Sequence, residues 1–305
     1  MAVLEPYKGG YYLWKYLPSP EAAGAVTALF AVLTAAYCWR IWRTRSWFCI
    51  PFPVGGLMSV IGYATRATAR ENTAKLMPYA IQNTMILLAP VLFAAAIYMT
   101  LGRAIRSSGG ERHSLIRPAW LTKLFVSGDV LSLVVQGGAA GLMVAGGSQA
   151  KTGQNIIIGG LVLQVLIFGL FCAAAFVFHV RMRRDPIVMA TERVPDIAAR
   201  RGVVPWRQTL RVLYVVSGLV MVRSVFRVVE FSMGQDGYLL STEWPLYVFD
   251  SLPMLTVMAV FWWWFPSAIA KPASWGEVTS LSDLNTISRG GAEVAERERM
   301  HKEAV

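Results

Sequence analysis

Four charged side chains lie beyond the first turn of two apolar segments near the end of the chain, at 209–230 and 244–265. They are Arg223, Arg227 and Glu230 in the first segment and Asp250 in the second. Each segment is long enough to cross a bilayer, which takes about 20 residues. A charge at the centre of a membrane helix costs roughly 2.5–3.5 kcal/mol on insertion scales. These side chains must therefore find partners, either one another or a bound ligand.

Depth in the membrane predicts which of these groups meet. At about 1.5 Å per residue, Arg223 lies roughly 21 Å from the inner edge of a hydrocarbon core about 30 Å thick. Asp250 lies roughly 9 Å below its outer edge, at the same level. We therefore predict that Arg223 and Asp250 form an ion pair. Gln136 falls near this level too, so we expect a polar site between the fourth, sixth and seventh helices, open toward the outer leaflet.

Other polar side chains fall at nearby depths, and together they form a candidate ligand site. Its residues are Asp129, Gln136, Gln164, Arg223, Arg227, Glu230, Glu243 and Asp250. A structural alternative remains open, in which the charges only neutralise each other and fix helix packing. Amides such as Gln136 and Gln164 often join membrane helices by hydrogen bonds. Glu243 also fits an interfacial position near a helix start, where the dipole favours a carboxylate.

The composition predicts an all-α membrane protein made of one bundle. The 305 residues are 55% hydrophobic and 15% charged, whereas soluble domains average about 25% charged residues. The net charge of +11 is typical of cytoplasmic loops facing anionic lipid, so we expect no nucleic-acid partner. Cys38, Cys49 and Cys172 lie in or beside apolar segments, and we expect core residues without disulfides. We also expect no cleaved signal peptide.

Hydropathy predicts seven spanning helices. They cover about 21–39, 46–66, 77–102, 120–144, 155–180, 209–230 and 244–265. The first, third and fifth connections and the tail carry about three times as many Lys and Arg as the remaining connections and the N-terminus. Positive charge favours the cytoplasm. We therefore expect residues 1–20 outside the cell and a cytoplasmic, largely disordered tail over 267–305.

Several seven-helix classes are excluded by missing residues. A retinal protein needs a lysine in its last helix, and 244–265 contains none. Zinc hydrolases need clustered histidines, but His113, His179 and His301 are scattered. The chain lacks a phosphate-binding GxxxxGK[ST] motif. We expect no enzymatic activity, no catalytic residues, no metal site and no cofactor.

Separated motifs in the chain resemble one family. They are IGYATR, SGDVLSLVVQGGAAG, VRSVFRVVEFSMGQDGYLLSTEW and YVFDSLPM. In these motifs the chain resembles the fungal lipid-translocating exporter family, also called aminocholesterol-resistance-like proteins. The resemblance implies seven spans, an outside N-terminus and a fungal plasma membrane or endomembrane location, of which we favour the plasma membrane. It also implies a role with sphingoid long-chain bases and in resistance to toxic lipids or drugs, and it covers the same eight polar residues.

The sequence is consistent with two functions. The first is a translocase or exporter of sphingoid bases or similar amphipathic molecules, whose partners are membrane lipids and the carried ligand. The second is a seven-helix sensor of such a ligand, signalling to a cytoplasmic partner through the loop 181–208 and the tail. Porphyrin or haem handling, implied for some relatives, has less support because no histidine lies at mid-depth.

Overall fold

The computed structural model describes residues 14, 16–71, 75–108, 110–145, 148–185, 206–234 and 237–264. Seven helical segments in these ranges are long and apolar enough to cross a membrane, and the described residues include no strand. The predicted seven-helix membrane fold is therefore confirmed. Most of the loop 181–208 and the whole tail 267–305, on which the sensor hypothesis depends, lie outside the described residues.

Five of the seven spanning helices are longer than hydropathy alone indicates, whereas α2 and the last span are slightly shorter. They are α1 (Pro20–Thr44), α2 (Pro51–Thr68), α3 (Leu76–Ser107), α4 (Pro118–Ala145), α5 (Ser148–Arg183), α8 (Trp206–Ser232) and a last span in which the π-helical turn η5 (Leu246–Ser251) continues into α10 (Leu252–Trp263). A short helix, α9 (Tyr238–Ser241), precedes the last span. Hydropathy stops at the first charges, whereas a helix continues past them because long basic side chains reach the aqueous interface.

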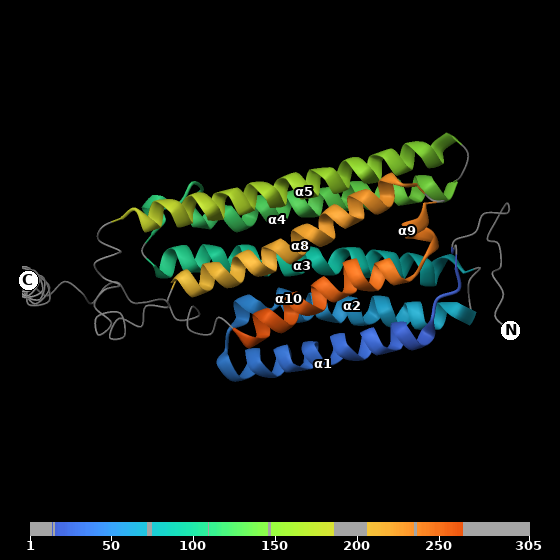
Figure 1. Ribbon diagram of the computed structural model, residues 1–305, viewed down its shortest axis with the longest axis horizontal. Coiled ribbons are helices and arrows are strands. Elements are labelled where there is room, and N and C mark those ends of the chain that lie inside the picture. The colour runs from blue at the N-terminus through green and yellow to red at the C-terminus, as the bar shows by residue number, and fades with distance from the viewer. Residues whose placement is uncertain are drawn as a thin grey trace, which may run out of the picture. The chain divides into compact units, whose positions relative to one another are not determined.

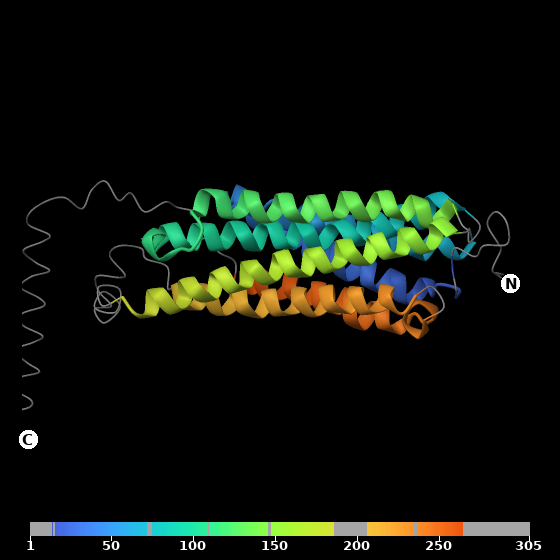
Figure 2. The same ribbon diagram turned by 90° about the horizontal axis from the view of Figure 1, so that it is seen from above.

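The spans run side by side along the length of the bundle (Figure 1), and their contacts close into a ring. Each packs against the next span in the chain, α10 closes the ring against α1, and α3 meets α8 across the middle. The turned view in Figure 2 agrees, with α8 running alongside α5. We call the end of the bundle where α1 begins the N-terminal end. The connections α2–α3, α4–α5 and α8–α10 lie there as well.

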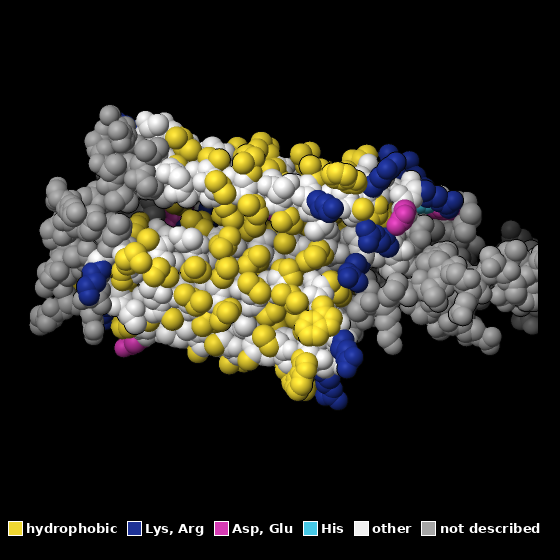
Figure 3. All heavy atoms as spheres, turned by 180° about the vertical axis from the view of Figure 1, so that it is seen from behind, with side chains coloured by type: hydrophobic (Ala, Val, Ile, Leu, Met, Phe, Trp, Pro, Cys, Tyr) yellow, Lys and Arg dark blue, Asp and Glu magenta, His cyan; other side chains and the backbone are white. Residues whose placement is uncertain are grey.

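The outer surface of the bundle is suited to lipid. Figure 3 shows a broad hydrophobic face in the middle, with most of the visible Lys and Arg side chains at the end opposite the N-terminal end. Large apolar side chains of the spans, such as Val32, Trp42 and Leu170, are exposed. This distribution is typical of a belt in contact with hydrocarbon, bounded by a basic interface.

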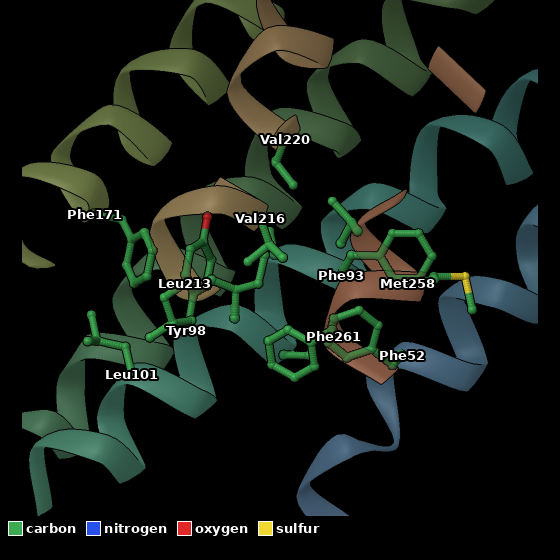
Figure 4. Packing of buried hydrophobic residues seen from close by; sticks show 14 of the residues in the cluster. Phe52, Phe93, Tyr98, Leu101, Phe171, Leu213, Val216, Val220, Met258 and Phe261 are labelled. Carbon is green, nitrogen blue, oxygen red and sulfur yellow. The ribbon is translucent and has the colours of Figure 1, made fainter. Parts of the chain in front are cut away.

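Aromatic and aliphatic side chains fill the interior (Figure 4). Phe52 of α2 stacks with Phe93 of α3 and Phe261 of α10, with ring centroids 5.4 Å and 4.5 Å apart. Further across, Tyr98 of α3 packs against Phe171 of α5 at 4.5 Å. The core therefore links both sides of the ring through α3.

A pair of glycines lets α2 pack closely between its neighbours. A Cβ atom on Gly56 would lie 2.2 Å from Thr34 Oγ1 of α1, and one on Gly55 would lie 2.9 Å from the Ala89 carbonyl oxygen of α3. Small residues at helix contacts are the usual means of close packing in membranes, where van der Waals contact drives association. The glycines thus fix the position of α2, which carries Tyr63 and Arg66.

Candidate functional site

A cluster of four buried charges joins α8 to the last span. Arg223 Nε lies 2.7 Å from Asp250 Oδ1, which confirms the predicted pair. Arg227 Nε lies 3.3 Å from the same oxygen, and Arg227 Nη1 donates to Glu230 Oε2 at 2.8 Å. All four side chains are buried. We call Arg223, Arg227, Glu230 and Asp250 the ionic cluster; its formal charges cancel.

Helical geometry brings these side chains together. Arg223, Arg227 and Glu230 are spaced i, i+4 and i+7 on α8, so they form one stripe. Asp250 sits in the π-helical turn η5. Single π-helical turns inside α-helices are rare and occur often at functional sites. Hydropathy gave no sign of this turn, because a π-turn does not alter composition.

Two further helices complete the ionic cluster. Tyr63 of α2 lies with its hydroxyl 2.5 Å from Ser251 Oγ and donates to Asp250 Oδ2 at 3.3 Å. Arg223 Nη2 donates to the carbonyl oxygen of Ile86 in α3 at 3.3 Å. We expected α4 to border this site through Gln136. Among the described residues the bonding partners come from α2 and α3 instead, since α3 meets α8 across the ring.

The polar residues of α4 and α5 form a separate group. Gln136 Nε2 donates to Ser132 Oγ at 2.9 Å and to Gln164 Oε1 at 3.4 Å. Ser132 in turn donates to the Gly160 carbonyl oxygen at 2.5 Å. These bonds join α4 to α5, as expected for amides that link membrane helices.

Asp129 lies on the same face of α4 and bonds to α3. Its Oδ2 accepts a hydrogen bond from the Tyr98 hydroxyl at 2.8 Å. Its Oδ1 is buried and has no hydrogen-bond partner. No described ion pair includes Asp129. Asp129 is therefore a buried carboxyl without a described cation beside it, unlike Glu230 and Asp250 of the ionic cluster.

Glu243 belongs to a third group, at the N-terminal end. It accepts from Arg66 Nη2 at 3.0 Å, from the Tyr247 hydroxyl at 2.9 Å and from the backbone N–H of Ser19 at 3.0 Å. The Arg66 guanidinium carbon also lies 5.4–5.7 Å from the ring centroids of Trp14, Tyr16 and Tyr247. We call this arrangement around Arg66 the arginine cage.

The arginine cage lies at the end of α2. Arg66 is the last residue of the span predicted over 46–66, and in the last turn of α2 it has only 2% of its side chain exposed. Burial raises the pKa of the Tyr16 phenol, so this hydroxyl stays protonated and accepts a hydrogen bond from Arg66 at 2.6 Å. Tyr63 and Arg66 were both missed as site residues. The signal was present in IGYATR, because an i, i+3 pair shares a helix face.

The opposite end of the bundle carries a basic hollow of about 190 Å³, lined by His179, Arg183, Arg207 and Arg211. His179 Nδ1 lies 3.0 Å from the Tyr214 hydroxyl.

Across the ranges that the structure describes, no three His, Cys, Asp or Glu side chains gather closely enough to hold a metal ion. The eight predicted site residues thus fall into three sets: the ionic cluster, the α4–α5 group with Asp129, and the arginine cage, which holds Glu243.

The chain is similar to several known membrane-protein sequences of yeast. The family model described as "RTA1 like protein" matches residues 52–273. Protein RTM1 of Saccharomyces cerevisiae is 33% identical over 82% of this chain and 90% of its own length. Protoporphyrin uptake protein 1 of the same species is 38% identical over 70% of this chain and 66% of its own length. Sphingoid long-chain base transporter RSB1, also from that yeast, is 25% identical over 74% of this chain and 66% of its own length. No solved structure matches.

Proposed function

The chain belongs to the RTA1-like family, and on this premise we propose that it moves single-chain cationic lipids, above all sphingoid long-chain bases, between the two leaflets of a fungal plasma membrane. It is a multi-pass membrane protein with seven apolar spans. The relative named as a sphingoid base transporter supports the substrate class. In this proposal the N-terminal end faces the cell exterior, in agreement with the distribution of Lys and Arg.

The observation that carries the proposal is the position of Arg227 between two carboxylates. It donates to Glu230 at 2.8 Å and lies 3.3 Å from Asp250. Sphingoid bases carry an ammonium group, which can donate hydrogen bonds to the same two carboxylates. Arg223 holds Asp250 at 2.7 Å from another direction. Arg227 is therefore the exchangeable cation in the proposal, and Arg223 keeps Asp250 ionised while the lipid is bound.

The surface next to the ionic cluster suits the lipid tail. Val222 and Val229 of α8 and Leu252 of α10 are exposed on the outside of the bundle. Phe226 of α8 stacks on Phe249 of η5, with centroids 5.0 Å apart, across the seam between these helices. A head group entering through this seam would leave its tail in the surrounding hydrocarbon. The cost of burying an ammonium group would then be offset by the two carboxylates.

Leaflet exchange in liposomes tests the proposal. Purified protein is reconstituted, and the exchange of a fluorescent sphingoid base is compared with that of a fluorescent neutral phospholipid. We expect wild type to accelerate exchange of the base, and Asp250→Asn and Glu230→Gln to lose this acceleration. Glu111→Gln is the matched control, because its carboxylate is exposed. Thermal unfolding is measured for each variant, since loss of exchange counts only in a folded protein.

The outcomes separate the competing functions. Binding of the base without faster exchange than in empty liposomes would overturn the translocase and favour the sensor. Normal exchange by folded Asp250→Asn would remove the ionic cluster from the site. Early melting of Asp250→Asn, with normal exchange by Glu230→Gln, would make the charges a packing device.

Protoporphyrin is the second candidate ligand. A relative 38% identical over 212 residues is named for its uptake, and porphyrin carboxylates suit Arg223 and Arg227. Protoporphyrin is therefore included as a competitor in the binding assay. If it displaces the sphingoid base and is itself carried, the substrate class changes from cationic to anionic amphiphiles.

A further inference from the structure

The carboxyl group of Asp129 stands apart from every other buried acid of the spans. Asp250 and Glu230 each contact an arginine, and Glu243 contacts Arg66. Asp129 has one neutral donor, the Tyr98 hydroxyl, and an Oδ1 atom with no partner. An ionised carboxylate in such surroundings is strongly disfavoured, whereas a protonated carboxylic acid needs no cation.

The surroundings of Asp129 are closed and apolar. The side chain is 1% exposed. The Tyr98 ring that bonds it packs against Phe125 of α4 and Phe168 and Phe171 of α5, at centroid distances of 5.5, 6.0 and 4.5 Å. Such a site has no room for a lipid head group while the bundle is closed, but a proton needs no volume.

The titratable neighbours of Asp129 are few. On α3 the facing group is the Tyr98 phenol, and on α5 it is the Cys172 thiol behind that phenol. The only cation of α4 is Lys123, which is exposed and lies over the Trp120 ring. No described Lys, Arg or His of α3, α4 or α5 pairs with Asp129. Its charge state therefore depends on the proton itself.

A line of polar groups leads away from Asp129. Ser132 and Gln136 follow it at i+3 and i+7 on α4, which is one face of the helix. Gln136 bonds to Ser132 and to Gln164 of α5, and its own Oε1 has no partner. Two unpaired buried acceptors thus lie about 10 Å apart along one helix, at 1.5 Å per residue. This line runs toward the N-terminal end of the bundle.

From this arrangement we infer that Asp129 binds and releases a proton during each transport cycle and so couples lipid movement to a proton gradient. The carboxylate takes one proton from the aqueous phase on one side, becomes a neutral acid, and returns that proton on the other side. No bond of the lipid changes. The inference rests on the proposed function, because it supplies the driving force for that movement.

Proton flux in liposomes tests the coupling. A pH-sensitive dye is enclosed with reconstituted protein, a fluorescent sphingoid base is added, and protons moved per lipid exchanged are determined after subtracting empty liposomes. We expect wild type and Glu111→Gln to move protons with lipid. Asp129→Asn should move none, yet it should fold normally because the Asn amide oxygen can still accept from Tyr98.

Infrared difference spectroscopy supplies a readout independent of transport. Wild-type protein should show a carboxylic acid carbonyl band that disappears as the pH is raised, and Asp129→Asn should lack this band. A folded wild type without the band, or lipid exchange without proton flux, would overturn the inference. Failure of wild type to exchange lipid at all contradicts the proposed function instead, and the infrared result still decides whether Asp129 titrates.

A purely structural role for Asp129 makes a different prediction. If the carboxyl only ties α4 to α3, Asp129→Asn keeps that bond and resembles wild type in stability, exchange and proton flux. Tyr98→Phe, which removes the same bond from the other side, would then be the more disruptive variant. Equal proton flux in wild type and Asp129→Asn would therefore exclude coupling through this residue.

Discussion

Arg66 and Glu243 form an ion pair with an Nη2–Oε1 distance of 3.0 Å, which joins the last turn of α2 to the connection just before the last span. The arginine side chain is 2% exposed and the glutamate 18%. The same carboxylate accepts from the backbone of Ser19, just before α1. The Glu243 carboxylate therefore ties three segments, far apart in the chain, at the N-terminal end of the bundle.

Removing the charge of Glu243 should destabilise the bundle. In Glu243→Gln, Arg66 keeps its aromatic contacts but loses its carboxylate, which leaves a buried cation without an anion. We expect the free energy of unfolding to fall by about 1–3 kcal/mol, because Glu243 is partly open to solvent. Thermal unfolding in detergent measures this, with exposed Arg70→Gln as the control. Equal melting of the two variants would contradict the prediction.

The ionic cluster should show strong coupling between Arg227 and Glu230. Arg227→Met leaves Glu230 buried without its cation, and breaking a buried pair in this way costs about 3–5 kcal/mol. The double variant Arg227→Met/Glu230→Met removes both charges and should cost less than the sum of the two single changes. Unfolding of all three variants and wild type gives the coupling. Additive losses would show that the two groups do not stabilise each other.

Close packing of α1 on α2 should depend on Gly56. A Cβ atom there would lie 2.2 Å from Thr34 Oγ1 and 2.9 Å from Met258 Cε. We expect Gly56→Ala to lower stability by about 1–3 kcal/mol, the usual cost of overpacking. Gly24→Ala is the matched control on α1, since no atom lies within 4 Å of its added methyl group. A Gly56→Ala melting point at or above that of Gly24→Ala would show that the helices separate at no cost.

The two ends of the bundle should differ in accessibility. In a cysteine-free background, Lys151→Cys places a thiol at the N-terminal end and Glu111→Cys places one at the opposite end. Both positions are exposed. A membrane-impermeant thiol reagent should label Lys151→Cys in intact cells, and Glu111→Cys only after permeabilisation. The reverse pattern would invert the proposed orientation. If neither variant is labelled in intact cells and both are labelled after permeabilisation, the protein lies in an internal membrane.

Counting residues along each span predicted the depth of each site residue in the membrane. It could not predict where around the ring that residue lies. Arg223 and Asp250 meet because their levels coincide and α8 packs against the last span. Gln136 was assigned to nearly the same level, yet its partners are Ser132 and Gln164. The position of a helix around the ring depends on packing between segments far apart in sequence. Short contacts such as those of Gly55 and Gly56 determine it, and no local pattern reports them.

The roles of Tyr63 and Arg66 could not be derived for a similar reason. Each side chain is defined by a partner about 180 residues later in the chain, Ser251 for Tyr63 and Glu243 for Arg66. The π-helical turn that carries Asp250 also depends on its surroundings, since nothing in the composition of 246–251 distinguishes it from an ordinary helix start. Charge and hydropathy predicted the seven spans, and tertiary contact determined the site.

The dependence of two arginines on the end of the chain has a consequence for biosynthesis. Arg66 pairs with Glu243 and Arg223 with Asp250, whereas Arg227 already has Glu230 on its own helix. While a ribosome is still making the segment that contains Glu243 and Asp250, Arg66 and Arg223 sit in or beside the membrane without their anions. A nascent chain that stops before Glu243 therefore keeps uncompensated charge in or beside the membrane. Quality control in the membrane can recognise this charge and degrade the chain.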